Sequence, residues 1–228
     1  MKRVRWLSAE WPISIRTLAT KMKGHLFAEN SFDGFVIDRV RDNFIEAHYI
    51  EKMSFQESVT DPFGKEEIFD RVSYRSVEFT LFSDFPNIEL RDASRSTREL
   101  TNKLLEICNF SLTVIPLTVD LLEWIEAIQR VLNQDILVDS LQVSGFEIEK
   151  DIAAKILIKS HVDVRSALKN ITLDKKYLLE KVQIKIVTGS ELIPIHMTNT
   201  GMVKIPENHV NDFLPILRSS LPSPIKKK

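Results

Sequence analysis

The sequence predicts an α+β fold with two related halves, each a small antiparallel sheet with packed helices. Between residues 75 and 81, Val77, Phe79 and Leu81 alternate with polar residues, which is typical of a half-buried strand. Residues 121–132 carry apolar side chains at helical spacing on more than one stripe, which is typical of a helix buried between layers. Strand-like segments followed by a helix occur in both halves, so the same layout is expected twice, although no residue-level repeat relates them.

The N-terminal half is expected to comprise residues 1–115. Its β-rich segments predict strands at residues 2–7, 35–41, 44–58, 68–82, 88–91 and 110–115. A first helix is expected over residues 13–26, and the segment Asp-Pro-Phe-Gly at residues 61–64 marks a turn. Ser96 and Glu99 are spaced as a capping box, so a second helix is expected to begin there.

A connecting helix is expected within residues 116–134 and a C-terminal sheet-and-helix half within residues 135–219. Thr118 is placed to cap the connecting helix, and Trp124 is expected in its buried stripe. The predicted strands of the C-terminal half are residues 137–148, 152–159, 182–187, 192–197 and 202–205, and its helices are residues 164–171 and 207–217. Pro215 should distort the last helix, and residues 220–228 are expected to form a disordered basic tail.

Composition excludes several classes of protein. Of the 228 residues, 43% are hydrophobic and 28% are charged, so a wholly disordered chain is excluded. No apolar run approaches the ~18 residues of a membrane-spanning helix. The single cysteine, Cys108, leaves no internal disulfide framework and no Cys-rich zinc site. We therefore expect a cytoplasmic protein without a membrane partner or a cofactor.

Charge is unevenly distributed along the chain. The formal net charge of −1 does not by itself indicate nucleic-acid binding. Residues 150–185, however, contain nine Lys or Arg and four Asp or Glu, a net charge of +5. This basic segment is where a polyanion is expected to bind.

The basic segment places lysines on one face of two predicted strands. Lys155 and Lys159 share a strand face. Lys181, Gln183 and Lys185 likewise share one, opposite the apolar residues Val182, Ile184 and Ile186. Two such strands in one sheet would form a positive surface that replaces counterions around phosphates. The helix and loop between them add further candidate contacts, Arg165, Lys169, Lys175 and Lys176. A solvated sheet face whose lysines only aid solubility is the alternative.

Ser160, His161 and Asp163 are the residue types of a catalytic triad, but a polar loop is the better interpretation. Adjacent side chains of an extended chain point to opposite faces, and no nucleophile-elbow glycines accompany them. The five histidines of the chain form no close pair and no HExxH arrangement, so no metal site is expected.

A second constellation has the outline of a metal-dependent nuclease. Asp84 precedes the triplet formed by Glu89, Leu90 and Arg91, where such enzymes use two carboxylates to hold Mg²⁺ and a lysine to help activate water. Arginine stays protonated and cannot act as a base, which disfavours catalysis here. A turn with solvated charges is the simpler interpretation.

Several segments, taken in order, resemble the family of the recombination-associated protein RdgC. Residues 88–94 followed by a helix are similar to the strand, acidic turn and helix of that family. Val-Ile-Pro-Leu-Thr at residues 114–118, with Glu-Trp-Ile at residues 123–125, is the most specific part of a match that covers roughly residues 80–205. The phage exclusion protein RexA is a more distant resemblance.

This resemblance implies a homodimer that binds double-stranded DNA without sequence preference and modulates recombination, or acts in anti-phage defence. It adds His161 to the candidate DNA contacts, because Lys159, Ser160 and His161 fall where the family has a basic DNA-facing stretch. The family's long helical insertion corresponds here to the turn at residues 61–67. We expect no catalysis, a nucleoid-associated location, and a recombination or defence protein as a further partner. A metal-dependent nuclease and a protein–protein adaptor without DNA binding are the alternatives.

Overall fold

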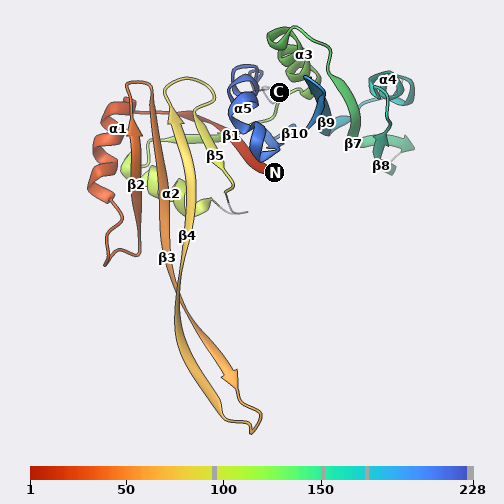
Figure 1. Cartoon of the computed structure of the whole chain (residues 1–228). Helices are drawn as coiled ribbons and strands as arrows, with labels where there is room; N and C mark the ends of the chain where they lie inside the picture. The colour runs from red at the N-terminus through yellow and green to blue at the C-terminus, as the bar shows by residue number, and fades with distance from the viewer. Residues whose placement is uncertain (94–96, 150–151, 173–174, 225–228) are drawn as a thin grey trace. The chain divides into compact units, whose positions relative to one another are not determined.

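The computed structural model describes residues 1–93, 97–149, 152–172 and 175–224 (Figure 1). Its strands are β1 (Lys2–Glu10), β2 (Asp33–Val40), β3 (Phe44–Thr60), β4 (Glu66–Phe82), β5 (Ile88–Arg91), β6 (Thr113–Pro116), β7 (Leu137–Glu149), β8 (Ile152–Lys159), β9 (Leu178–Thr188), β10 (Glu191–Thr198) and β11 (Met202–Ile205). Its helices are α1 (Ile15–Met22), α2 (Arg98–Ile107), α3 (Leu121–Leu132), α4 (Arg165–Thr172) and α5 (Val210–Ser219), with short 3₁₀ turns η1 (Lys23–His25) and η2 (Glu207–His209). Within these ranges, no helix is long and apolar enough to cross a membrane.

The expected arrangement of two small sheets is wrong. The described strands belong to one antiparallel sheet of eleven strands, in the order β2-β3-β4-β5-β1-β11-β10-β9-β7-β8, with β6 paired to β1. The physical reason lies in β1, whose residues 2–5 pair with residues 202–205 of β11. Backbone hydrogen bonds join these distant segments, and such bonds leave no local side-chain pattern in the sequence.

Packing divides the chain into two compact units. The N-terminal unit is Ala9–Val114, and the C-terminal unit combines Met1–Ser8 with Ile115–Lys228. The first part of β1 therefore packs with the C-terminal part of the chain, which the expected boundary at residue 115 did not include. Each unit is described separately below.

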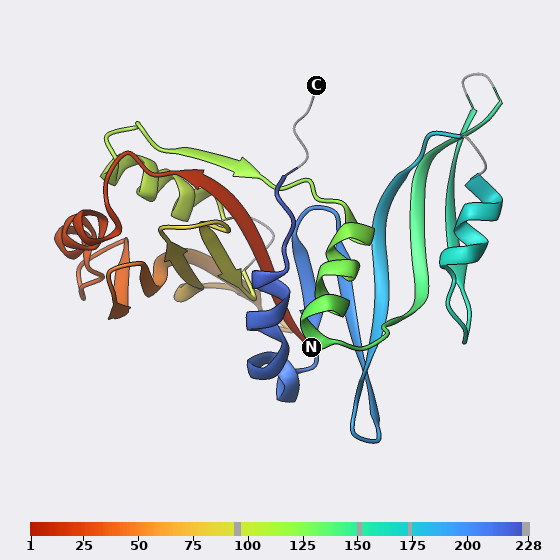
Figure 2. The same ribbon diagram turned by 90° about the horizontal axis from the view of Figure 1, so that it is seen from above.

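In the C-terminal unit, α3 and α5 cover one face of the sheet and lie on the same side of β9 and β10 (Figure 2). Trp124 of α3 is fully buried, as predicted, and its Nε1 donates a hydrogen bond to the carbonyl oxygen of Leu217 at 3.0 Å. Its ring meets that of Trp6 edge to face, with 5.8 Å between centroids. One aromatic side chain thus joins α3, α5 and β1.

The ends of the helices differ from expectation in two places. The carboxylate of Asp120, rather than Thr118, caps α3 by accepting hydrogen bonds from the N–H groups of the first turn. Helix α5 continues through Pro215, and Leu221 after it is buried in the core, so residues 220–224 do not form the expected free tail. Ser96, the expected cap of α2, and the lysines of residues 226–228 lie outside the described residues.

The N-terminal unit has its own aromatic core. The ring of Phe35 on β2 lies 5.3 Å from that of Tyr49 on β3 and 6.0 Å from that of Phe79 on β4, measured between centroids. Helix α1 is capped by Ser14 and buries Leu18 and three neighbours at helical spacing. The period-two pattern that predicted these strands therefore marks a face that is covered.

Strands β3 and β4 extend beyond this core as a two-stranded arm, formed by residues 53–73 (Figure 1). The strands stay paired out to Thr60 opposite Glu66, whereas β2 leaves β3 at Glu51. Charged and polar side chains of the arm pair with one another, as in the 2.8 Å contact between Arg71 Nε and Glu57 Oε2. Its large apolar side chains are exposed instead: Phe55, Val59, Phe63, Ile68, Phe69 and Val72. The short turn expected at residues 61–67 is thus the tip of a long hairpin.

Candidate nucleic-acid interface

The two lysine-bearing strands lie in one sheet and present their lysines on one face. Val182 and Ile184 of β9 are buried against the α3 and α5 side, so Lys181 and Lys185 point away from these helices. In β8, Ile156 and Ile158 pack against the core, which leaves Lys155, Leu157 and Lys159 on the opposite face. Strand β7 lies between β8 and β9, so the two pairs of lysines are not direct neighbours.

Other strands add basic residues that sequence reasoning missed. Residues directly opposite in an antiparallel ladder share a face. The registers place six residues of successive strands in one row across that face: Arg3, Lys204, His196, Gln183, Ser140 and Lys159. Alternation within residues 192–197 and 202–205 could have assigned His196 and Lys204 to a polar face. The strand order that brings them beside the predicted lysines is not visible locally. We call this surface, opposite α3 and α5, the lysine face.

Two of the predicted lysines are neutralised by carboxylates. Lys185 Nζ lies 2.8 Å from Asp139 Oδ2, and Lys155 Nζ lies 2.6 Å from Glu180 Oε2. Hydrogen bonds lower the pKa of Glu180 to about 2, and the bond from Lys155 has the largest effect, followed by that from Ser144. Burial opposes this shift, and the hydrogen bond from Gln142 adds to it. These two lysines therefore add little net positive potential to the lysine face.

Three lysines on the face have no such partner. Within the described parts of the chain, Lys159, Lys181 and Lys204 form no ion pair. They surround a hollow of about 370 Å³. Its lining has no Asp or Glu and consists of Met1, Ser140, Gln142, Leu157, Lys159, Lys181, Val182, Gln183, His196, Met197, Thr198, Met202 and Lys204. We call this cavity the central hollow.

His161 lines a second, more open hollow of about 510 Å³ beside the first. Lys159, Ser140 and Gln183 line both hollows, and Lys185 joins His161 in the second. The predicted residues Lys159, His161, Lys181 and Lys185 are thus brought together by the fold.

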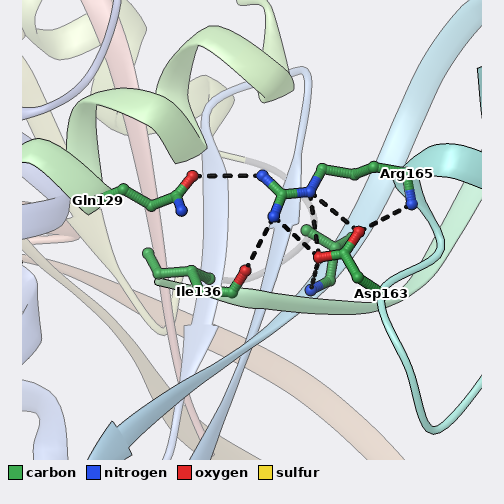
Figure 3. A network of polar contacts seen from close by, with 5 residues as sticks. Gln129, Ile136, Asp163 and Arg165 are labelled. Atoms are coloured by element: carbon green, nitrogen blue, oxygen red, sulfur yellow. Dashed lines mark hydrogen bonds and ion pairs between the residues drawn. The ribbon is translucent and has the colours of Figure 1, made fainter. Parts of the chain in front are cut away.

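Arg165 is held inside the protein structure instead (Figure 3). Its guanidinium donates to both carboxylate oxygens of Asp163, to Gln129 Oε1 at 3.3 Å and to the carbonyl oxygen of Ile136 at 3.2 Å. Burial opposes ionisation of Asp163, but the hydrogen bonds from Arg165 and from the N–H of Val138 outweigh it and lower the pKa of Asp163. Arg165 ties α4 to α3, so its guanidinium is engaged within the protein, and Asp163 is not free to serve a triad.

The remaining predicted cations lie on or after α4. Lys169 is exposed on the helix, and Lys175 and Lys176 are exposed between α4 and β9. The ammonium of Lys175 lies 4.9 Å from the ring centroid of Phe146 on β7, a cation–π contact. None of the three lines the two hollows of the lysine face.

The residues of the nuclease alternative do not converge. Glu89 is fully buried and pairs with Arg91, whose Nη1 also lies 2.8 Å from Glu78 Oε1. Burial alone would lower the pKa of Arg91, but the charge of Glu89 and the hydrogen bonds that Arg91 donates to the carboxylates of Glu78 and Glu89 raise it. Asp84 is exposed in the turn before β5. The described residues include no group of three or more His, Cys, Asp or Glu placed to hold a metal ion.

Anion binding at the lysine face is expected to strengthen as the pH falls. Partial burial lowers the pKa of His196, and the positive charge of Lys204 lowers it further. The negative charge of Asp139 opposes this shift, and the positive charge of Lys159 adds to it. The neutral imidazole is therefore favoured near pH 7. Protonation adds a positive charge that a bound phosphate stabilises, so affinity for DNA should rise as the pH falls through this lowered pKa. Fluorescence anisotropy between pH 5.5 and 8 should show the rise.

His196→Gln should remove most of this pH dependence. His25→Gln, in the N-terminal unit, should leave it intact. An unchanged pH profile in the His196 variant would exclude His196 as its source.

No family model matches this chain, and no curated protein is significantly similar to it.

Proposed function

We propose that the chain is a double-stranded DNA-binding protein without sequence preference that acts as a homodimer. Its setting would be RdgC-like modulation of recombination, or anti-phage defence, at the nucleoid in the cytoplasm with a recombination or defence protein as partner. The observation that carries this proposal is a set of three lysines on one sheet face that have no carboxylate partner among the described residues, Lys159, Lys181 and Lys204. Ammonium groups so placed can replace the counterions of a phosphate backbone.

The spacing of these lysines suits a duplex. Lys204 on β11 and Lys159 on β8 are four strand spacings apart, roughly 19 Å along the sheet at ~4.8 Å per step. This exceeds the ~12 Å width of the major groove of B-DNA, so the lysines at the two ends can contact phosphates of both strands.

The lack of sequence preference follows from the amides of the face. Gln142 and Gln183 are amide side chains of this face that could read an adenine edge, since glutamine pairs with adenine through two hydrogen bonds. Gln142 Nε2 instead donates to Glu180 at 2.6 Å, and Gln183 Nε2 donates to Asp139 at 3.2 Å. With both amides engaged inside the protein, phosphate contacts dominate, and these carry no sequence information.

A binding assay over a salt series tests the proposal. Two unrelated duplexes of equal length should bind with equal affinity at low salt, and log affinity should fall linearly with log salt concentration. No binding of either duplex at low salt would favour the adaptor alternative. Degradation of the duplexes in the presence of Mg²⁺ would favour the nuclease alternative.

We expect the chain to be a dimer in solution. Pairing two copies would double the phosphate contacts on one duplex. The exposed apolar side chains of the arm, among them Phe55 and Phe69, also favour assembly, because monomeric proteins rarely leave such a group uncovered. Light scattering at micromolar concentration should therefore report about twice 26.3 kDa. A monomer that binds DNA with full affinity would contradict this geometry.

A further inference from the structure

The central hollow differs in shape and chemistry from the rest of the lysine face. Its middle strands carry the short side chains Ser140 on β7 and Thr198 on β10 beside the longer Gln142, Lys181, Gln183 and His196. Longer side chains rise at its two edges, Lys159 with Leu157 on β8 and Lys204 with Met202 on β11. Contacts to the outside of a duplex need only a positive surface, so a backbone-binding role leaves the cavity itself unexplained.

The charges around the central hollow select an anion. Lys159, Lys181 and Lys204 line it together with His196, whereas the nearby carboxylates of Asp139 and Glu180 are held by other lysines and do not line it. Lys181, His196 and Lys204 lie on three successive strands and match a phosphate group, which offers several acceptor oxygens and up to two negative charges.

The apolar edges select a ligand with an apolar body besides its phosphate. Leu157 and Met202 stand at opposite ends of the row that has Lys181 at its centre, so an apolar side chain lies two strands to either side of this ammonium group. A volume of about 370 Å³ lies near the lower end of the ~300–1,000 Å³ that small-ligand sites occupy. The space therefore suits one nucleotide and not a longer oligonucleotide.

We propose that the central hollow binds a single nucleoside monophosphate unit. The phosphate contacts Lys181 on β9 and Lys204 on β11, with His196 on the strand between them, and the base lies against Leu157 on β8. This unit can be a free mononucleotide or the 5′-phosphorylated terminal nucleotide of a DNA strand, since both present the same chemistry. The inference uses the lysine face of the proposed function but requires the cavity, which duplex-backbone binding does not.

Calorimetry on the full chain tests the inference with three probes: deoxyadenosine monophosphate, deoxyadenosine and inorganic phosphate. The monophosphate should bind at least tenfold more tightly than either part alone, because the site contacts both phosphate and base. Equal affinity for phosphate and monophosphate, or no binding of the monophosphate, would overturn the inference.

A filling variant separates this site from duplex binding. Leu157→Trp occupies the central hollow without changing charge and should weaken monophosphate binding at least tenfold, while duplex affinity stays within twofold. Leu192→Trp is the matched control, because Leu192 is 55% exposed against 56% for Leu157 and lies on the same sheet face outside the hollow. Unchanged monophosphate binding in Leu157→Trp would overturn the inference, whereas failure of the wild type to bind duplex overturns only the proposed function.

Competition distinguishes the two sources of the nucleotide. If the natural ligand is a DNA end, a 5′-phosphorylated overhang should bind more tightly than its 5′-hydroxyl counterpart, and the monophosphate should compete away the difference. Equal binding of the two overhangs, with tight binding of the monophosphate, assigns the site to the free nucleotide.

Discussion

Replacing Lys159 and Lys181 together by glutamate is expected to weaken binding to all duplexes alike, roughly 100-fold at ~0.1 M salt. Both lysines line the central hollow, and neither pairs with a carboxylate in the part of the chain that the structure describes. Two lost phosphate contacts should reduce the slope of log affinity against log salt by about two units, and the electrostatic gain disappears near ~1 M salt. Between ~0.1 M and ~1 M salt, a change of two units in this slope corresponds to about two decades of affinity, which gives the 100-fold loss expected at ~0.1 M.

The matched control changes the same net charge elsewhere. Lys23 is exposed in η1 of the N-terminal unit, and Arg130 is exposed on α3, which covers the opposite face of the sheet. Lys23→Glu with Arg130→Glu should therefore alter affinity much less than the change in the lysine face. An equal loss would mean that total charge, rather than the lysine face, determines binding.

Lys226→Glu provides a second control, at a position outside the described residues. Its effect should also be small if the lysine face carries the phosphate contacts, because this change leaves Lys159, Lys181 and Lys204 intact. If it proved as damaging as the double change, binding would be driven by the C-terminal lysines. Circular dichroism should show unchanged folding in both double variants, since all four of their replaced side chains are exposed.

Trp124→Ala is expected to destabilise the C-terminal unit by roughly 3–5 kcal/mol, the range for truncating a large aromatic side chain in a core. The change removes the fully buried indole, its edge-to-face contact with Trp6 and the hydrogen bond to the carbonyl oxygen of Leu217. That carbonyl would lose its side-chain donor inside the core, which adds to the cost of the cavity. Chemical denaturation followed by fluorescence measures the loss.

Trp11→Ala is the comparison for this effect. The Nε1 of Trp11 also donates to a backbone carbonyl, that of Phe82 at 2.8 Å, but its side chain is only half-buried. Its replacement should therefore cost less than that of Trp124. An unchanged melting temperature combined with lost DNA binding in Trp124→Ala would contradict the core assignment of Trp124.

Local patterns predicted the elements of this protein and the face on which each side chain lies. The alternation around Lys181 and Lys185 assigned them to the face opposite Val182 and Ile184 because side chains of a strand alternate with a period of two. The helical spacing around Trp124 marked a buried stripe for a similar reason. These properties depend on residues a few positions apart, so they are readable from the sequence.

The candidate site depended on more than this periodicity. All four lysines look alike in the sequence. Glu180 neutralises Lys155 and Asp139 neutralises Lys185, whereas these two acids leave Lys159 and Lys181 available. The acids that make the difference reach these lysines across strands, where no local spacing indicates them. Arg165 likewise looks like a surface cation until Asp163, Gln129 and the carbonyl of Ile136 enclose its guanidinium.

The sequence by itself determined which segments are strands or helices and which side chains alternate toward solvent, because these follow from local spacing and from transfer of apolar groups out of water. Only the tertiary structure decided the strand order. The pairing of β1 with β11 brought Arg3 opposite Lys204, and the pairing of β11 with β10 added His196 to the lysine face. The same order encloses the central hollow and replaces two small sheets by one. Backbone hydrogen bonds are nearly identical for every residue, so the choice of strand neighbours rests on the packing of the whole chain.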